Sequence, residues 1–146
     1  MRTLLATLIL LSCPALVGAE DRFGIPSDLK TYPQTTPKET LASILKAVQA
    51  KQVAYLAAHL ADPVYINERV KRFYGGQFEE QVSDIRGALN PLTVKQMQRF
   101  LDKGTWTTDK TTATVRLDDL PDRVVRLVSR DGRWFLTSSW SASVKP

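Results

Sequence analysis

The stretch that decides the fold is Asp122-Arg-Val-Val-Arg-Leu-Val-Ser-Arg-Asp-Gly-Arg-Trp-Phe-Leu-Thr-Ser-Ser-Trp140, near the end of the 146-residue chain. Asp131 and Gly132 separate two runs of β-branched and aromatic residues, and an Asp-Gly pair readily adopts the positive φ angles of a tight hairpin turn. A two-residue loop sets Leu127 opposite Leu136 in the paired strands. The stretch therefore predicts an antiparallel hairpin of defined register.

The two faces of this hairpin differ in character, because successive side chains of a strand point to opposite sides of the sheet. We expect the more apolar face to pack into the core, and its members are Val125, Leu127, Trp134 and Leu136. The other face mixes Arg126 with apolar side chains. We expect those side chains to be covered by a ligand, a partner subunit or a loop, and they are Val124, Val128 and Phe135.

Upstream of the hairpin the apolar residues follow a helical period. Thr36, Pro37 and Glu39 form a predicted capping box, in which the Thr36 side chain caps the helix and Glu39 reaches back to the capping amide. Two short helices, or one bent helix, are expected from there to Asp62-Pro63, because proline disfavours helix at the residue before it. Both halves carry apolar residues at i, i+3, i+4 and i+7 spacing, which indicates one buried face.

The next segment is expected to hold a brief strand at residues 64–66 and then three helical pieces. Asn67 is the predicted cap of the first piece, and Gly75-Gly76 breaks the chain before the second. Asn90-Pro91 ends the second piece and starts the third, for which Gly104 is the predicted C-terminal cap residue.

From residue 105 onward the period changes to alternation. Ala113, Val115 and Leu117 alternate with polar residues, which is typical of a half-buried strand. Helices followed by consecutive antiparallel strands make an α+β protein. We therefore predict N-terminal helices packed on a curved C-terminal antiparallel sheet of three to four strands.

The N-terminus has the three-part layout of a secretory signal peptide. Arg2 precedes the short apolar run Leu4–Leu11, and small residues at Val17-Gly18-Ala19 suit a cleavage site. Export to the periplasm or the extracellular space is predicted, with a signal peptide over 1–19 and a mature chain from residue 20. Lipidation of Cys13 is the second-ranked route, since Leu10-Leu11-Ser12-Cys13 resembles a lipobox. No stable membrane span is expected, because the apolar run is too short.

Cys13 is the single cysteine, so removal of the signal peptide leaves no disulfide, no catalytic thiolate and no cysteine metal ligand. We predict an extended leader or linker over 20–35 and a single domain over 36–146. The formal net charge is +5. Arginines around the hairpin either meet an anionic partner or form a solvated strand edge, and no aromatic and basic interleaving of a nucleic-acid motif accompanies them.

Two segments carry a resemblance to a known family. Leu56-Ala-Ala-His-Leu-Ala-Asp-Pro63 lies in the second predicted helix, and Arg130-Asp-Gly-Arg-Trp-Phe135 lies in the terminal strands. Over about residues 36–140 the pattern resembles the nuclear transport factor 2-like superfamily, also called cystatin-like cone or SnoaL-like. The resemblance implies a strongly curved sheet wrapped around a long helix, with a conical pocket. The helical segment 67–103 is longer than in a compact member, which leaves the family's early strands short, displaced or absent.

His59 is the only histidine and the weak catalytic candidate of the chain. It either lines a pocket as an acid or base, or is a partly buried, hydrogen-bonded residue on a helix. Enzymes of the family pair a carboxylate or histidine with tyrosines inside the cone, but no motif residue can be matched one by one. The candidate pocket or partner-binding residues are Tyr55, His59, Tyr65, Tyr74, Trp106 and Phe135. The aromatic members are equally suited to a plain core.

Metal and cofactor sites are not predicted. One histidine without cysteine leaves only an all-oxygen metal site, and Asp118, Asp119 and Asp122 lack the spacing of a calcium loop. Gly75-Gly76 lacks the lysine and the serine or threonine of a phosphate-binding loop.

The leading hypothesis is an exported, non-enzymatic domain that binds a small apolar ligand or a protein partner through a cone-like pocket or a sheet face. The first alternative is an acid-base enzyme, of isomerase or dehydratase type, that uses His59 on a small apolar substrate. The second is a self-associating scaffold, such as a homodimer formed through the outer face of the sheet.

Overall fold

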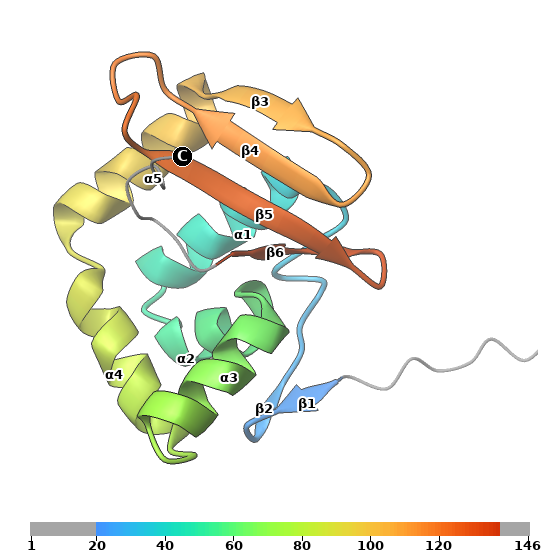
Figure 1. Cartoon of the computed structure of the whole chain (residues 1–146), viewed down its shortest axis with the longest axis vertical. Helices are drawn as coiled ribbons and strands as arrows, with labels where there is room; N and C mark the ends of the chain where they lie inside the picture. The colour runs from blue at the N-terminus through green and yellow to red at the C-terminus, as the bar shows by residue number, and fades with distance from the viewer. Residues whose placement is uncertain (1–19, 138–146) are drawn as a thin grey trace, which may run out of the picture.

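The computed structural model describes residues 20–137. A small two-stranded hairpin comes first, then helices from residue 37 to residue 103, and finally four strands between residues 105 and 136 (Figure 1). The protein is therefore α+β, with the helices preceding an open antiparallel sheet.

Helix α1 (Pro37–Gln49) begins where the sequence predicts it. The Thr36 hydroxyl accepts a hydrogen bond from the Glu39 amide at 3.2 Å, and Pro37 occupies the first turn. The Glu39 carboxylate does not complete the predicted capping box, because it accepts a hydrogen bond from the Thr35 hydroxyl instead. One face of the helix is buried, as its period predicts, and carries Leu41, Ile44, Leu45 and Val48.

The second helical segment changes its winding partway. Helix α2 (Val53–Tyr55) leads into the π-helical turn η1 (Leu56–Leu60), which closes with the Ala61 amide donating to the Leu56 carbonyl at 2.9 Å. Ala61 is extended and forms a parallel bridge with Leu136 of the sheet. The wider turn therefore ends where the chain joins the sheet edge.

Helix α3 (Pro63–Phe73) corrects two sequence predictions. The strand expected at 64–66 is wrong, because these residues form the first turns of the helix. The cap is Asp62 rather than Asn67, since the Asp62 carboxylate accepts from the Val64 amide at 3.1 Å. Local β-branched and aromatic composition favoured a strand, but an aspartate cap followed by proline initiates a helix.

Helices α4 (Phe78–Ala88) and α5 (Pro91–Lys103) are separated as predicted. Gly75 and Gly76 have φ of 56° and 89°, in the left-handed region that glycine tolerates, and they break the chain before α4. The Asn90 side chain accepts from the Thr93 amide at 2.9 Å and caps α5. Gly104 is the C-terminal cap residue of α5.

The sheet follows the order β3-β4-β5-β6, with every neighbour antiparallel. Its strands are β3 (Thr105–Thr108), β4 (Thr112–Arg116), β5 (Val124–Arg130) and β6 (Arg133–Leu136). The predicted register of the terminal hairpin is confirmed, because Leu127 pairs with Leu136 and Val128 pairs with Phe135. Asp131 and Gly132 have φ of 49° and 76°, so both turn residues take the positive angles that the sequence predicts. The predicted pairing of Val125 with Ser138 falls outside the described residues.

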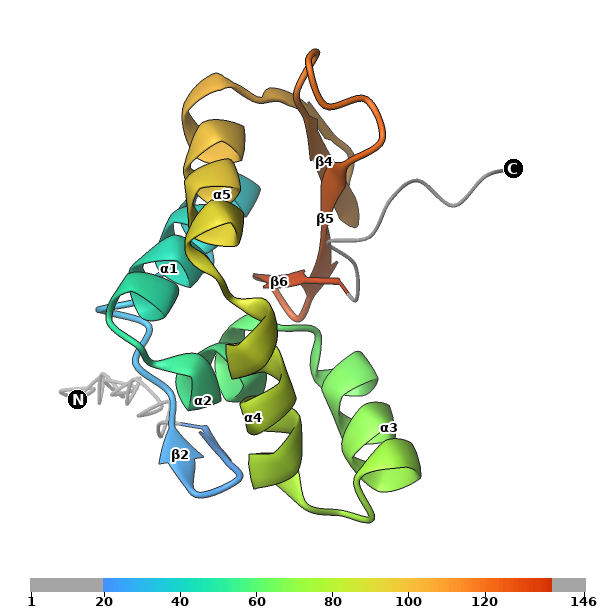
Figure 2. The same ribbon diagram turned by 90° about the vertical axis from the view of Figure 1, so that its left-hand side faces the viewer.

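Helices α1 and α5 cover one face of the sheet (Figure 2). Phe100 of α5 and Leu41 of α1 pack against the face of the hairpin that carries Val125, Leu127 and Trp134, which confirms this face as core. On the opposite face Val124 and Phe135 are also buried, whereas Val128 is half-buried.

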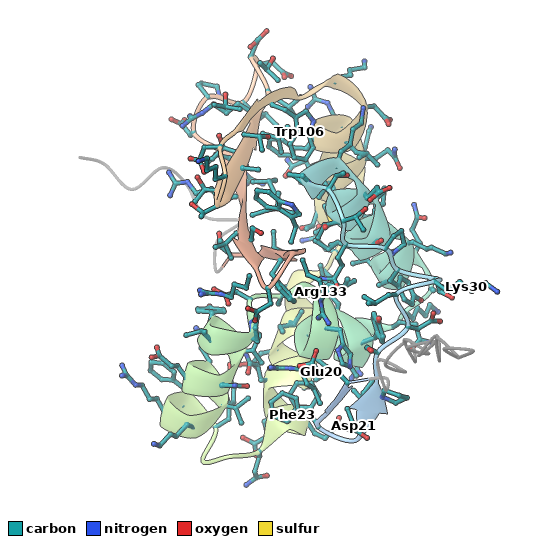
Figure 3. All side chains as sticks on the ribbon, turned by 90° about the vertical axis from the view of Figure 1, so that its right-hand side faces the viewer. Glu20, Asp21, Phe23, Lys30, Trp106 and Arg133 are labelled. Carbon is teal, nitrogen blue, oxygen red and sulfur yellow. The ribbon has the colours of Figure 1, made fainter. Side chains whose placement is uncertain are left out.

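Residues 20–35 are fastened to the domain at several points. Strands β1 (Asp21–Arg22) and β2 (Ile25–Pro26) form a hairpin, and the Glu20 carboxylate pairs with Arg133 at 2.9 Å (Figure 3). The Gln34 side-chain amide donates to the carbonyls of His59 at 3.0 Å and Trp134 at 2.7 Å, so this segment links the helical layer to the sheet. Within residues 20–137 no helix combines the length and apolar character needed to cross a membrane.

Candidate functional site

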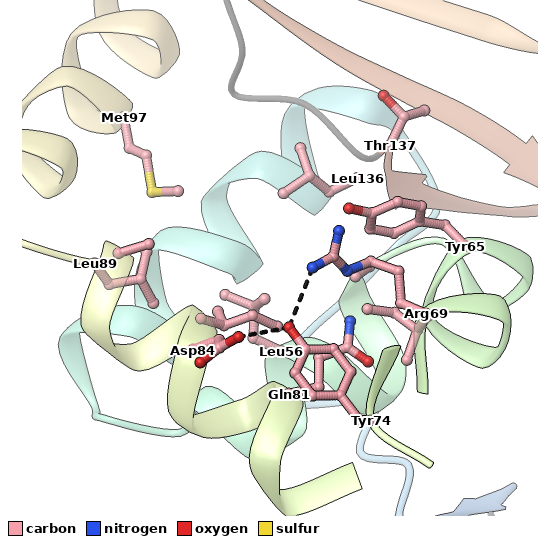
Figure 4. Close-up of a pocket in the computed structure, with 14 residues that line it drawn as sticks. Leu56, Tyr65, Arg69, Tyr74, Gln81, Asp84, Leu89, Met97, Leu136 and Thr137 are labelled. Carbon is pink, nitrogen blue, oxygen red and sulfur yellow. Dashed lines mark hydrogen bonds between the residues drawn. The ribbon is translucent and has the colours of Figure 1, made fainter. Parts of the chain in front are cut away.

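A cavity of about 270 Å³ lies where helices α3, α4 and α5 meet η1 and the end of β6 (Figure 4). Most of its walls are apolar, because the inner faces of three helices and the last core residue of β6 converge there. Its lining residues are Leu56, Ala61, Tyr65, Ile66, Arg69, Tyr74, Gln81, Asp84, Ile85, Ala88, Leu89, Met97, Leu136 and Thr137. The volume lies just below the range of about 300–1,000 Å³ that is typical of small-molecule pockets, and the mainly apolar lining with a few polar groups is typical of them.

Gln81 supplies a polar group inside this apolar wall. The residue is only 2% exposed, and its Oε1 atom has no hydrogen-bond partner in the part of the chain that the structure describes. A buried polar atom normally has a hydrogen-bond partner, because burying it without a hydrogen bond costs about 1–3 kcal/mol. Gln81 therefore lies at the cavity wall with its carbonyl oxygen enclosed and without a partner among residues 20–137.

Arg69 projects from α3 into the cavity beside the rings of Tyr65 and Tyr74 (Figure 4). Its guanidinium carbon lies 5.6 Å, 5.4 Å and 5.8 Å from the ring centres of Tyr65, Phe73 and Tyr74. Tyr65 and Phe73 are four residues before and after Arg69, so the helix itself places both rings beside the guanidinium.

A short hydrogen-bond chain holds the Arg69 guanidinium in place. Arg69 donates to the Tyr74 hydroxyl at 3.1 Å, and Tyr74 donates to the Asp84 carboxylate at 2.6 Å. The bond to Tyr74 raises the pKa of Arg69, so the side chain stays charged. Among the described residues Arg69 forms no direct ion pair with a carboxylate, and Asp84 reaches it only through the tyrosine.

Two of the six candidate residues from the sequence, Tyr65 and Tyr74, line this cavity together. Tyr55 does not: it is buried, and its hydroxyl accepts from the Asp28 amide at 2.8 Å. Burial raises the pKa of the Tyr55 phenol. Trp106 packs at the edge of the core beneath the sheet, and its buried indole N–H has no partner among residues 20–137.

His59 is fully buried in η1, beside the Tyr55 ring at 4.9 Å between centres, and does not line the cavity. Its Nε2 lies 2.7 Å from the Ile25 carbonyl, whereas Nδ1 is buried without a partner among the described residues. Burial lowers the pKa of His59; the bond to Ile25 opposes this, and the positive charge of Arg133 adds to it. The geometry is that of a neutral structural histidine that donates from Nε2.

Phe135 lies in a second groove, at the hairpin end of the sheet. The Arg133 guanidinium covers its ring at 5.0 Å. The charges in this groove are largely paired, because Arg133 bonds Glu20 at 2.9 Å and Arg130 bonds Asp62 at 2.8 Å. These ion pairs give Arg130 and Arg133 a structural role, whereas Arg123 and Arg126 form no ion pair within residues 20–137.

Sequence reasoning missed Arg69, Gln81 and Asp84. A signal existed for Arg69, since aromatic residues four positions away on both sides of an arginine predict ring contacts on a helix. Gln81 lies next to Val82, which belongs to the buried apolar face of α4. The sequence does not show that Gln81 is buried too, because that depends on which helix packs against α4. The convergence of the three residues is a tertiary effect.

Within residues 20–137 no group of three or more histidine, cysteine, aspartate or glutamate side chains gathers closely enough to hold a metal ion. A scan against known protein families, a search of curated proteins and a search of solved structures each found no match to this chain.

Proposed function

We propose that this protein binds a small, mainly apolar molecule in the cavity between α3, α4, α5 and β6. The observation that carries the proposal is the buried Gln81 carbonyl without a partner, in the wall of an apolar cavity of about 270 Å³. A purely structural cavity gains nothing from an unsatisfied polar atom. Rotation of the Gln81 amide would turn this oxygen towards the cavity, where a hydrogen bond donated by a ligand would offset its desolvation and orient the ligand.

Filling the cavity with a protein side chain tests this proposal. Ala88 is exposed at the end of α4 and lines the cavity, so Ala88→Trp places an indole at the binding site with little cost to the core. Wild-type protein is expected to bind the neutral fluorescent probe N-phenyl-1-naphthylamine at one saturable site, and Ala88→Trp is expected to weaken that binding at least about tenfold. Titration followed by probe fluorescence measures both.

The matched control is Ala42→Trp, which adds the same side chain at an exposed position of α1 that does not line this cavity. Ala42→Trp should bind the probe as the wild type does, and both variants should keep the wild-type circular dichroism spectrum. Absence of saturable binding to the wild type, or equal binding by all three proteins, contradicts the proposed site.

The acid-base alternative receives no support from the position of His59. It requires that histidine in a cavity beside a carboxylate or a tyrosine, whereas His59 is fully buried against the Ile25 carbonyl and lies outside the cavity lining. The scaffold alternative needs an outer sheet face free to pair, and two members of that face, Val124 and Phe135, are already buried. Binding of a small molecule is therefore the function that we propose.

Membership of the nuclear transport factor 2-like superfamily stays a prediction. Helices on one face of a four-stranded antiparallel sheet support it at the level of architecture. The cavity, however, lies among helices at the β6 end, and the face that a cone would leave open is filled by side chains such as Phe100 and Leu41.

We propose that the protein is exported and that its mature chain begins at Glu20. A chain that starts there keeps the contacts that fasten the first strand, since the Glu20 carbonyl accepts from the Ser27 amide at 2.8 Å and its carboxylate pairs with Arg133. Intact mass measurement of the exported protein tests this. A mass that includes residues 1–19, or a lipid attached at Cys13, overturns it.

A further inference from the structure

We propose that the ligand of the cavity is a small amphipathic carboxylic acid whose carboxylate pairs with Arg69. This inference rests on the proposed binding function and narrows it to a chemical class. Its basis is a charged, oriented guanidinium that faces an apolar cavity without a carboxylate of its own among the described residues.

The first step of the argument is preorganisation. Arg69 is held by the rings of Tyr65 and Phe73 and by its hydrogen bond to Tyr74, so its rotamer is set before any ligand arrives. A side chain that is already ordered loses less conformational entropy on binding. Such support is expected for a recognition residue and is unnecessary for a solvated surface arginine.

The second step concerns hydrogen-bond capacity. A guanidinium carries five N–H donors in a fixed fork, and within residues 20–137 its hydrogen-bond partners are the hydroxyls of Tyr74, at 3.1 Å, and Tyr65. Donors therefore remain for an incoming acceptor. A planar carboxylate matches that fork with two parallel hydrogen bonds.

The third step is charge. Asp84 also lines the cavity, on the far side of the Tyr74 hydroxyl, so the charges of Arg69 and Asp84 sum to zero before a ligand binds. A monoanionic carboxylate beside Arg69 adds one negative charge, whereas a phosphate dianion adds two and is repelled more strongly by Asp84. The apolar walls, which include Leu56, Met97 and Leu136, then receive the hydrocarbon part of the ligand.

A matched pair of probes separates the carboxylate from the hydrocarbon. Octanoate and octan-1-ol carry the same chain, and isothermal titration calorimetry of the full-length mature protein measures both dissociation constants. We expect octanoate to bind about tenfold more tightly at low ionic strength, as a charge-assisted hydrogen bond implies. We expect Arg69→Gln to remove that preference and to leave octan-1-ol binding within about twofold of the wild type.

Arg72→Gln is the matched control, because Arg72 is exposed on the same helix and does not line the cavity. It removes one positive charge from α3 but should keep the preference for octanoate. If Arg69→Gln does not fold, Arg69→Lys replaces it, and this variant should show a reduced preference because an ammonium lacks the planar fork.

Each outcome separates this inference from the function on which it rests. Equal binding of the two probes to the wild type, or loss of the preference in Arg72→Gln as much as in Arg69→Gln, overturns the carboxylate inference and leaves the binding function intact. A wild-type protein that binds neither of these probes nor N-phenyl-1-naphthylamine overturns both.

Discussion

His59 shows how a single residue can look functional in a sequence and be structural in the fold. It is the one side chain with an ordinary pKa near neutrality, yet it is fully buried, with Nε2 bonded to the Ile25 carbonyl and Nδ1 unpaired among the described residues. Protonation would add a second buried N–H with no acceptor there, close to Arg133. The fold therefore favours the neutral imidazole.

This environment predicts a pH dependence of stability. Burial lowers the pKa of His59 in the folded protein, so the unfolded chain takes up the proton first as the pH falls below about 6.5. The free energy of unfolding is expected to decline as the pH falls from about 7 towards 5, by at most about 1.4 kcal/mol per pH unit, until the folded-state pKa is passed. Urea denaturation at several pH values measures it.

The control for this prediction is His59→Gln, whose side-chain amide can still donate to the Ile25 carbonyl but does not titrate. The variant should lose the slope between pH 7 and 5 and keep the steeper loss at lower pH that carboxylates cause. Equal slopes in the two proteins would falsify the assignment of the pH dependence to His59.

At the scale of elements, the junction between α5 and β3 requires a glycine because of the space available there, and not because of the backbone conformation of a helix cap. Gly104 is the C-terminal cap residue, but its φ of −71° is accessible to any residue. A Cβ at this position would lie 2.2 Å from Val115 Cγ2 and 2.4 Å from the Phe100 carbonyl oxygen. The glycine thus permits close approach of helix and sheet rather than a left-handed backbone.

Gly104→Ala is accordingly expected to destabilise the protein by roughly 1–3 kcal/mol through overpacking. Gly87→Ala is the matched control within α4, where an added Cβ meets no atom within 4 Å. That substitution should raise stability by about 0.5–1 kcal/mol, because alanine is the better helix former. Thermal unfolding of both variants measures the difference, and a neutral Gly104→Ala would contradict the close approach.

At the scale of the whole molecule, Asp62 joins the helical half to the sheet. Its carboxylate caps α3 through the Val64 amide and receives two hydrogen bonds from Arg130, at 2.8 Å and 2.9 Å. Its backbone amide donates to the Leu136 carbonyl at 2.8 Å. The side wall of the cavity formed by η1 and β6 is therefore fixed by contacts between residues more than sixty positions apart in the sequence.

A double-mutant cycle of Asp62→Asn and Arg130→Gln should show a coupling energy of about 0.5–1.5 kcal/mol, since the pair is bidentate and half-buried. Asparagine keeps an oxygen for the helix cap, so the cycle isolates the ion pair. Arg99 and Asp119 supply the control pair, because the Asp119 side chain is 63% exposed whereas the Asp62 side chain is 11% exposed. Their coupling should stay below about 0.5 kcal/mol; equal couplings for the two pairs would remove the special role of Asp62.

The sequence by itself determined the features that depend on neighbours along the chain. The turn at Asp131 and Gly132, the register of the last two strands, the cap at Thr36, the helix boundary at Asn90-Pro91 and the α+β order all follow from local chemistry and period. The wrong prediction of a strand at residues 64–66 also has a local cause, because the helix start at Asp62-Pro63 outweighs the strand propensity of these residues.

Only the tertiary structure decided where a ligand could bind. Arg69, Gln81 and Leu136 come from two helices and the last strand, and nothing in their spacing states that they share one cavity. Their convergence depends on how the π-helical turn meets β6 and on which helix faces pack together. Local signals act over a few residues, whereas a binding site is made by contacts across the chain, so the packing of the helices against β6 creates this one.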